Sequence, residues 1–256
     1  MKGVLKIVAV VVLLLVVGVA ALFAVTFMGR QPMADGEEIG RVRIVADGFA
    51  GVAVIRLDDR RVALVDAGQD ETGEAILAEL RRRGLGAEAV TAILITHGHG
   101  DHIGAIRQFP QAEVMALEAE VSLVEGRAGA RGPLTRLFPV SPTGVEVTRV
   151  LRDGDVVTLG DVTVRVYAIP GHTAGSAAYF VDGVLLVGDS ADVTSDGAVQ
   201  GSPWLFSDSQ PENRASLVRL EQRLVADGLT VDAIVPSHSG VSRGGAALAT
   251  YARSMR

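Results

Sequence analysis

The sequence contains no cysteine, few aromatic residues and almost no lysine. With no cysteine among 256 residues, the chain cannot build a disulfide scaffold, a cysteine-ligated metal site or a thiol nucleophile. The formal net charge is −6, which argues against nucleic acid as a partner, because phosphate binding needs clustered basic residues. A chain of this length forms one sizeable domain or at most two small ones.

The only two lysines, Lys2 and Lys6, precede an uncharged apolar run over residues 7–28. At about 1.5 Å per helical residue, this run reaches roughly 33 Å, enough to cross a hydrocarbon core of about 30 Å. A cleaved signal peptide is the alternative, but its apolar region typically has about 7 to 15 residues. We therefore predict an uncleaved, single-pass transmembrane anchor, with the membrane as a partner. The short basic N-terminus predicts that the rest of the chain lies on the outer, periplasmic or extracellular, side of the cytoplasmic membrane.

The remainder of the chain predicts a linker and one domain that mixes strands and helices. Residues 29–40 are polar and include Pro32 and Gly36, which is typical of a linker. From residue 41 to residue 256, strand-like and helix-like patterns follow one another. The expected strands cover residues 42–46, 52–57, 62–65, 92–95, 156–159, 162–168, 177–181, 184–187 and 233–235, and the expected helices cover residues 71–83, the segment around Leu217, Leu220 and Leu224, and residues 245–253. This order predicts two packed sheets flanked by helices.

Two long stretches, residues 122–143 and 190–213, match no regular element. Loops of this length in a compact domain are commonly either disordered or functional. The second stretch contains Phe206 and the only tryptophan, Trp204. We predict that these two side chains belong to a lid or to the wall of a substrate pocket; the alternative is that they cover an edge of the core.

Three of the five histidines fall in one short segment, Thr-His-Gly-His-Gly-Asp-His-Ile-Gly at 96–104, directly after the strand expected at 92–95. Side chains alternate along an extended backbone, so His97 and His99 point to the same side. The two intervening glycines allow a sharp turn that brings Asp101 and His102 to the same place. This cluster predicts a metal site.

Three further residues with metal-binding side chains also follow strand-like runs. His172, Asp189 and His238 come just after the strands expected at 162–168, 184–187 and 233–235. A single histidine is most often an ordinary hydrogen-bonded residue, but five at strand ends, three of them clustered, are best explained by a shared metal centre.

These residues carry a resemblance to a known family. The H-x-H-x-D-H segment, followed by His172, Asp189 and His238, resembles the signature of the metallo-beta-lactamase fold superfamily, and Leu-Val-Asp-Ala-Gly at 64–68 resembles its early strand ending in Asp-x-Gly. The resemblance covers roughly residues 41–240. It implies a four-layer αββα sandwich of the α/β class, with the metal site at one edge.

The resemblance also implies a role for each of these residues. His97, His99 and His172 would hold one metal ion. Asp101, His102 and His238 would hold a second ion, with Asp189 bridging the two. Asp66 would stabilise the metal-binding loop without binding metal, although an ordinary turn aspartate would look the same in the sequence. This donor set suits two Zn²⁺ ions, and also iron or manganese.

The implied activity is metal-dependent hydrolysis of a small molecule. A metal-bound hydroxide would cleave an ester, thioester, lactone, amide or phosphoester, and Asp101 would orient it and pass on its proton. Asp189, together with the absence of cysteine, favours a branch similar to glyoxalase II. Two alternatives stay open: a mononuclear iron persulfide dioxygenase, and a membrane-tethered metal-binding module without turnover. The sequence indicates neither the substrate nor the oligomeric state.

Overall fold

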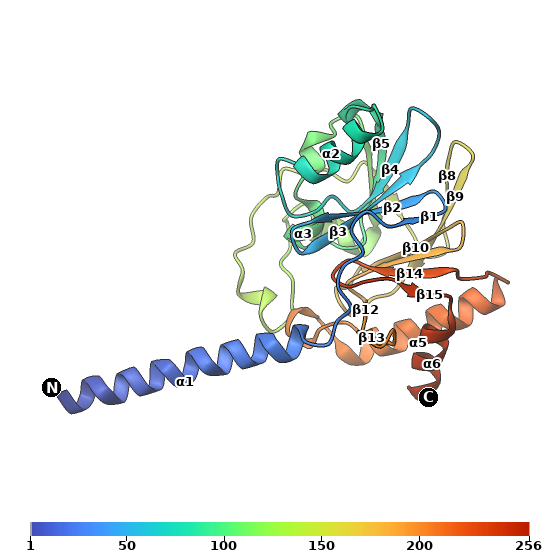
Figure 1. Ribbon diagram of the computed structural model, residues 1–256. Coiled ribbons are helices and arrows are strands. Elements are labelled where there is room, and N and C mark those ends of the chain that lie inside the picture. Colours follow the sequence, from blue (N-terminus) through green and yellow to red (C-terminus); the bar gives the residue numbers. More distant parts are fainter. Residues whose placement is uncertain (1, 256) are drawn as a thin grey trace.

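The computed structural model describes residues 2–255, apart from the side chains of residues 2, 4, 5, 7–9, 15, 20 and 25. Two sheets pack face to face, and helices cover their outer faces (Figure 1). This arrangement is the predicted αββα sandwich. The first sheet has the order β1 (Glu38–Ile39), β2 (Val42–Asp47), β3 (Ala50–Arg56), β4 (Val62–Val65), β5 (Val90–Leu94), β6 (Glu113–Leu117) and β7 (Arg149–Leu151).

The second sheet and the helices complete the sandwich. The second sheet has the order β15 (Ser242–Arg243), β14 (Ala233–Pro236), β11 (Val184–Gly188), β10 (Ala177–Val181), β9 (Val162–Ala168) and β8 (Val156–Leu159), and β12 (Ala191–Val193) pairs separately with β13 (Val199–Gly201). The α-helices are α1 (Lys2–Phe27), α2 (Glu74–Arg82), α3 (Gly100–Ile103), α4 (Val121–Val124), α5 (Gln210–Ala226) and α6 (Ala246–Ser254).

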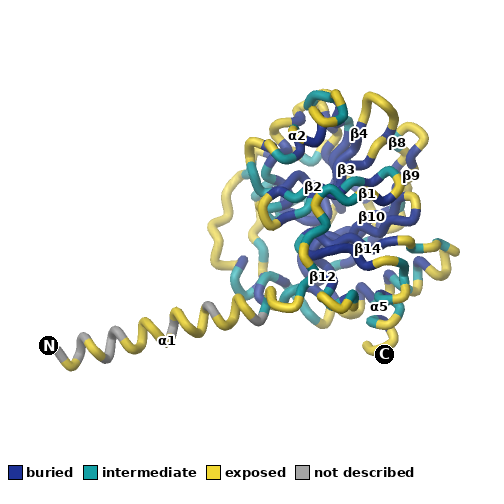
Figure 2. Tube along the Cα trace, in the orientation of Figure 1, coloured by how far each residue is buried: buried dark blue, intermediate teal, exposed yellow. Residues whose placement is uncertain are grey.

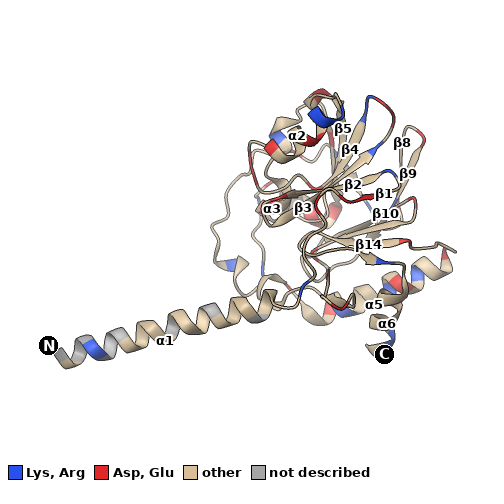
Figure 3. Cartoon of the chain, viewed as in Figure 1, with Lys and Arg blue, Asp and Glu red and all other residues tan. Residues whose placement is uncertain are grey.

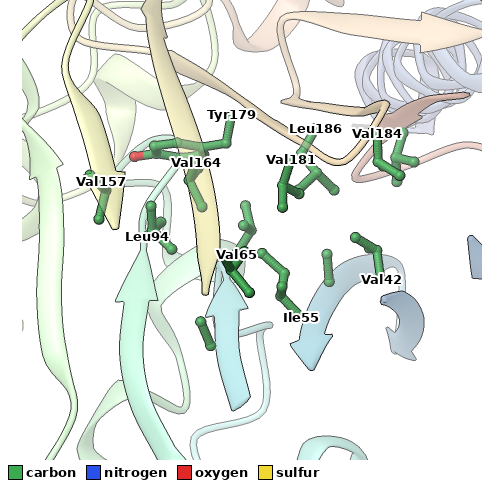
Figure 4. Packing of buried hydrophobic residues seen from close by; sticks show 14 of the residues in the cluster. Val42, Ile55, Val65, Leu94, Val157, Val164, Tyr179, Val181, Val184 and Leu186 are labelled. Carbon is green, nitrogen blue, oxygen red and sulfur yellow. The ribbon is translucent and has the colours of Figure 1, made fainter. Parts of the chain in front are cut away.

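The main apolar core lies between the two sheets. Figure 4 shows Val65 and Leu94 of the first sheet facing Val164 and Val181 of the second. A second cluster, which includes Ile76 of α2, covers the outer face of the first sheet. A third cluster joins the second sheet to α5 and α6. The central strands β4, β10, β11 and β14 are buried along their whole length, because both faces of each sheet are covered, and this explains their continuous apolar runs in the sequence.

Strand direction brings the candidate site residues to one edge. β4 and β5 are parallel neighbours in the first sheet, and β11 and β14 are parallel neighbours in the second. β9 runs in the same direction as β11, because both are antiparallel to β10. Two backbone hydrogen bonds tie the two edges together: Ala177 N donates to Thr96 O at 2.8 Å, and Gly51 N donates to Ser237 O at 2.7 Å. The segments that follow these strands therefore meet.

Helix α1 projects away from the sandwich, and only its C-terminal end lies near it (Figure 1). Its described apolar residues are exposed (Figure 2), and its described length carries almost no charge (Figure 3). Within the described residues, however, no helix combines the length and the apolar character needed to cross a membrane. The transmembrane anchor predicted for residues 7–28 is therefore not supported, and some side chains of that span lie outside the described residues.

The segment predicted as a linker, residues 29–40, lies against the domain. The buried side chain of Arg30 forms an ion pair of 2.7 Å with Asp192, and its backbone forms a bridge with Thr194. Gln31 N donates to Val193 O at 2.9 Å, and β1 pairs with β2. Hydrogen bonds thus hold this segment in place, because its backbone pairs with strands at the edge of the domain.

A buried carboxylate on α2 provides a stability test that does not involve the metal site. Glu79 binds Arg43 at 2.9 Å, Arg82 at 2.8 Å and Arg83 at 2.6 Å. Burial raises its pKa, but hydrogen bonds from Arg82 and Arg83 outweigh this effect and lower it to about 2. The pKa of Glu79 in the folded protein lies below the ordinary value of 4.5. The ionised carboxylate therefore stabilises the folded state fully above pH 4.5, and this stabilisation is lost as the pH falls towards 2.

We expect Glu79→Gln to lower the free energy of unfolding at pH 7 by about 1 to 2 kcal/mol, with screening by water at the half-exposed Arg82 limiting the effect. Urea unfolding at pH 7 and at pH 2.5 measures the difference, which should shrink at the lower pH. Glu74→Gln, on the exposed start of the same helix, is the matched control. An equal loss at both pH values would contradict this explanation.

Candidate metal centre

The histidine segment lies between β5 and α3. His97 and His99 are in the loop, His99 is the N-cap of α3, and the first turn of α3 carries Asp101 and His102. Gly98 has to be glycine, because a Cβ atom there would lie 2.6 Å from the backbone nitrogen of Val124. The chain therefore makes the predicted turn. Gly98 is required there, because the backbone of Val124 lies too close to leave room for a side chain.

Three imidazole nitrogens converge on one point. His97 Nε2 lies 3.0 Å from His99 Nδ1, and His172 Nε2 lies 3.1 Å from each of them. Burial is the main reason that the pKa of His97 is well below its usual value and that the pKa of His172 is lowered to about 3. Neutral imidazoles present lone pairs, so these three nitrogens form a set of donors for one metal ion.

A second set lies beside the first. His238 Nε2 is 3.2 Å from Asp101 Oδ2, and His102 Nε2 is 3.7 Å from the same oxygen. Asp189 lies between the two sets: its carboxylate is 3.0 Å from His238 and 3.3 Å from His102 on one side, and 3.6 Å from His172 on the other. The structure thus brings together all seven side chains that the sequence singled out as ligands, in two groups with Asp189 between them.

The electrostatics of this site favour positive charge. Burial lowers the pKa of His238, but the carboxylates of Asp189 and Asp101 outweigh this effect and raise it to about 10. Burial likewise raises the pKa of Asp101, but His102 and His238 lower it to about 2. Asp189 is buried and Asp101 is partly buried, and their negative charges favour cations in this pocket.

Asp66, predicted to stabilise the loop, supports one ligand of each set, His102 directly and His97 through Thr96. Its Oδ2 atom accepts a hydrogen bond from His102 Nδ1 at 2.8 Å and one from Thr96 Oγ1 at 2.7 Å. Thr96 Oγ1 lies 3.1 Å from His97 Nδ1, and because it donates to Asp66, it accepts from His97. Asp66 therefore fixes the tautomers of His97 and His102, leaving the Nε2 lone pairs of both rings directed into the site.

Further residues that support the ligands were not identified from the sequence. Ser207 Oγ donates to Pro203 O at 2.7 Å and lies 3.0 Å from His172 Nδ1, and Phe49 O lies 2.6 Å from His238 Nδ1. The buried Glu120 accepts hydrogen bonds from Gly98 N, Thr173 Oγ1 and Gly175 N. Glu120 thus ties the first histidine loop to the loop that carries His172; its only signal in the sequence was a charge within an apolar run.

The donor atoms fit divalent metal ions. Among the described residues, the buried atoms His102 Nε2 and Asp189 Oδ1 make no hydrogen bond. They face each other at 3.3 Å at the metal centre. Buried polar atoms without partners are costly, and a metal ion satisfies them.

A cavity of about 940 Å³ opens onto the site, and His99, Asp101, Asp189 and His238 are on its wall. The segment at 122–143 supplies much of the rest of that wall. Phe206 also lines the cavity, and its place in a substrate pocket stays a prediction. Trp204 is 57% exposed and is not among the described lining residues.

The fold and this arrangement of ligands define a class. The sequence profile of the Metallo-beta-lactamase superfamily matches residues 47–238, and the chain belongs to this superfamily. Solved structures of similar fold include the first B3 metallo-beta-lactamase with an active-site glutamic acid (TM-score 0.66, 22% identity, covering 93% of this chain and 92% of the other) and MIM-1 from Novosphingobium pentaromativorans (TM-score 0.65, 24% identity, 89% and 88%). At these identities, the similarity is one of fold.

The relatives in sequence indicate a branch of the superfamily. A hydroxyacylglutathione hydrolase of Cupriavidus taiwanensis is 39% identical over 127 residues, which are 49% of this chain and 41% of that protein. A hydroxyacylglutathione hydrolase of Synechococcus is 30% identical over 175 residues, which are 63% of this chain and 58% of that protein. The chain therefore spans about half the length of these relatives, and it is similar to the glyoxalase II-like branch.

Asp66 can be tested directly. We expect Asp66→Asn to weaken metal affinity roughly 10- to 100-fold, because the carboxylate that orients His97 and His102 loses one acceptor. Competition with a chromophoric chelator measures the affinity. Asp182→Asn is the matched control, because Asp182 is also an aspartate with positive φ, 45° against 62° for Asp66, and it lies in the turn between β10 and β11, away from the site. Equal affinities of the Asp66 variant and the unmodified protein would show that Asp66 only shapes the turn.

Proposed function

We propose that this chain is a dinuclear metal-dependent hydrolase that cleaves an ester or thioester bond of a small molecule. One observation carries the proposal: two sets of metal-binding side chains, His97, His99 and His172 on one side and Asp101, His102 and His238 on the other, lie side by side with Asp189 between them. The hydroxyacylglutathione hydrolase relatives support a thioester or a similar acyl compound.

The roles of the residues follow from their contacts. When bound, two divalent ions, most simply Zn²⁺, supply Lewis-acid chemistry that acidifies water and polarises the bond under attack. Asp189 would bridge the ions, and its charge would keep them close. Asp101 faces the cavity and is ionised at neutral pH, so it can accept a proton from the attacking water and deliver it to the leaving group.

Metal analysis combined with a substrate panel tests this function. The expected result is about two zinc ions per chain by mass spectrometry, together with turnover of at least one acyl ester or thioester. Loss of both metal and turnover in His97→Ala would link the ions to the activity. A fully metal-loaded chain that hydrolyses no member of an ester, thioester, lactone and amide panel would overturn the proposal.

The two alternatives predict different results. An iron persulfide dioxygenase with a single metal would leave the second set, Asp101, His102 and His238, without an ion, and about one iron per chain with oxygen consumption would reveal it. A binding module without turnover would hold metal tightly and be inactive on every substrate. The close second set of ligands favours the dinuclear hydrolase.

The location of the enzyme remains a prediction from the sequence. We predict that the enzyme lies on the outer face of the cytoplasmic membrane, because basic residues precede the apolar segment at 7–28. Cell fractionation, followed by protease treatment of spheroplasts, tests it. Recovery of the intact domain inside protease-treated spheroplasts would contradict the prediction.

A further inference from the structure

The cavity beside the metal centre has an apolar wall built from three distant parts of the chain. One side comes from the loop at 122–143, which contributes Leu134, Phe138 and Val140. The other side contains Phe23 and Phe27 from the end of α1, joined by Phe206. The wall continues to His99 and Asp101 at the metal centre, so a molecule with its reactive bond at the metal site can extend along it.

The three phenylalanines on the second side form an aromatic cluster, which we name the Phe23–Phe27–Phe206 cluster. The ring centroids of Phe27 and Phe206 are 5.9 Å apart, those of Phe23 and Phe206 are 6.3 Å apart, and Phe23 stacks on Phe27 at 5.9 Å. These separations are typical of favourable aromatic pairs. The cluster joins α1 to the loop that also carries Ser207, the hydrogen-bond partner of His172.

The residue that fixes this cluster in place is Arg30. Its guanidinium carbon lies 4.6 Å from the centre of the Phe27 ring, and its Nη2 atom pairs with Asp192 at 2.7 Å. The neighbouring backbone is also held, because Ser195 N donates to Gly29 O at 2.7 Å. The end of α1 is therefore a fixed part of the cavity wall.

The charges around the cavity argue against a strongly anionic substrate. Among the lining residues that the structure describes, Arg30 is the only arginine or lysine, and its charge is already paired with Asp192. A ligand with several carboxylates would need free cations to replace its hydration. An uncharged hydrocarbon chain needs only apolar contact, which this wall provides.

We propose that the substrate carries an apolar acyl chain of medium length, that this chain lies against the Phe23–Phe27–Phe206 cluster, and that the N-terminal helix thereby sets chain-length specificity. This inference rests on the proposed hydrolase function and names its substrate class. Each methylene buried contributes about 0.8 kcal/mol, which corresponds to roughly a fourfold gain in kcat/KM.

A series of p-nitrophenyl esters from two to twelve carbons, hydrolysed by the full-length chain, tests the inference. We expect kcat/KM to rise at least tenfold from the two-carbon to the ten-carbon ester. Phe27→Ala and Phe206→Ala should each lower this long-to-short ratio about fivefold or more. Leu137→Ala is the matched control, because Leu137 is 70% exposed in the loop at 122–143 and is not among the described lining residues.

A binding measurement separates this inference from the proposed function. Trp204 is the only tryptophan and lies in the same short helical turn as Phe206, so a bound 10-bromodecanoate should quench its fluorescence. Phe27→Ala should weaken the apparent affinity at least fivefold. Quenching without hydrolysis of any ester would overturn the hydrolase and retain the acyl site. Hydrolysis with no chain-length preference, or affinity unchanged in Phe27→Ala, would overturn the acyl site.

Discussion

Replacing Asp189 by alanine is expected to lower hydrolytic turnover by more than about 10³-fold and to reduce the metal content from two ions towards one. Asp189 lies within 4.0 Å of His97, His102, His172 and His238, so its removal takes the shared negative charge away from both sets of ligands. The stabilisation that a metal pair gives to a hydrolytic transition state amounts to several kcal/mol. Turnover and metal content are measured on the same preparation.

The matched control for this substitution is Asp59→Ala, in the exposed turn between β3 and β4. This control also replaces an aspartate by alanine, but at a position outside the metal centre, and it should leave both turnover and metal content unchanged. If the Asp189 variant kept two ions and full turnover, the carboxylate would not bridge the metals, and the assignment of the site would be wrong.

Replacing Asp101 by asparagine should separate proton transfer from metal binding. At saturating zinc we expect kcat to fall about 10²- to 10⁴-fold, the usual contribution of a positioned acid or base. The amide keeps the shape of the side chain and one oxygen that can bind metal, and His102 and His238 remain as ligands. The metal content should therefore stay near two ions once zinc is in excess.

The measurement is kcat as a function of zinc concentration, with Asp59→Asn as the control for a change from aspartate to asparagine. A variant that regains kcat within threefold of the unmodified protein as zinc is raised would show that Asp101 serves only as a ligand. A variant that stays inactive with two ions bound would assign the proton transfer to its carboxylate.

The long strands and their order could be predicted because each has a strong local pattern. β4, β9 and β11 have apolar residues in runs or alternation, as buried strands require. The short strands could not be predicted in this way. β7 has three residues, and β12 pairs with β13 inside residues 190–213, where the sequence matches no regular element. Pairing of such segments depends on neighbours that are remote in the sequence.

The same distinction applies to the site. The ligands have rare residue types at fixed positions after strands, so His97, Asp189 and His238 were visible in the sequence. Ser207 and the carbonyl of Phe49 support those ligands through ordinary hydrogen bonds, which leave no pattern of spacing. Residues 29–40 have the polar composition of a linker, but their backbone groups form hydrogen bonds along the edge of the domain, which composition does not reveal.

The position of Asp66 has a consequence for how the site fills. Through His102 it orients a ligand of one set, and through Thr96 it orients His97 of the other. A metal ion held by one set of ligands would therefore restrain the Asp66 side chain and, with it, a ligand of the other set. Part of the loss of conformational freedom that accompanies binding of a second ion would then already have occurred, so we expect a zinc titration to be cooperative, with the singly loaded protein as a minor species.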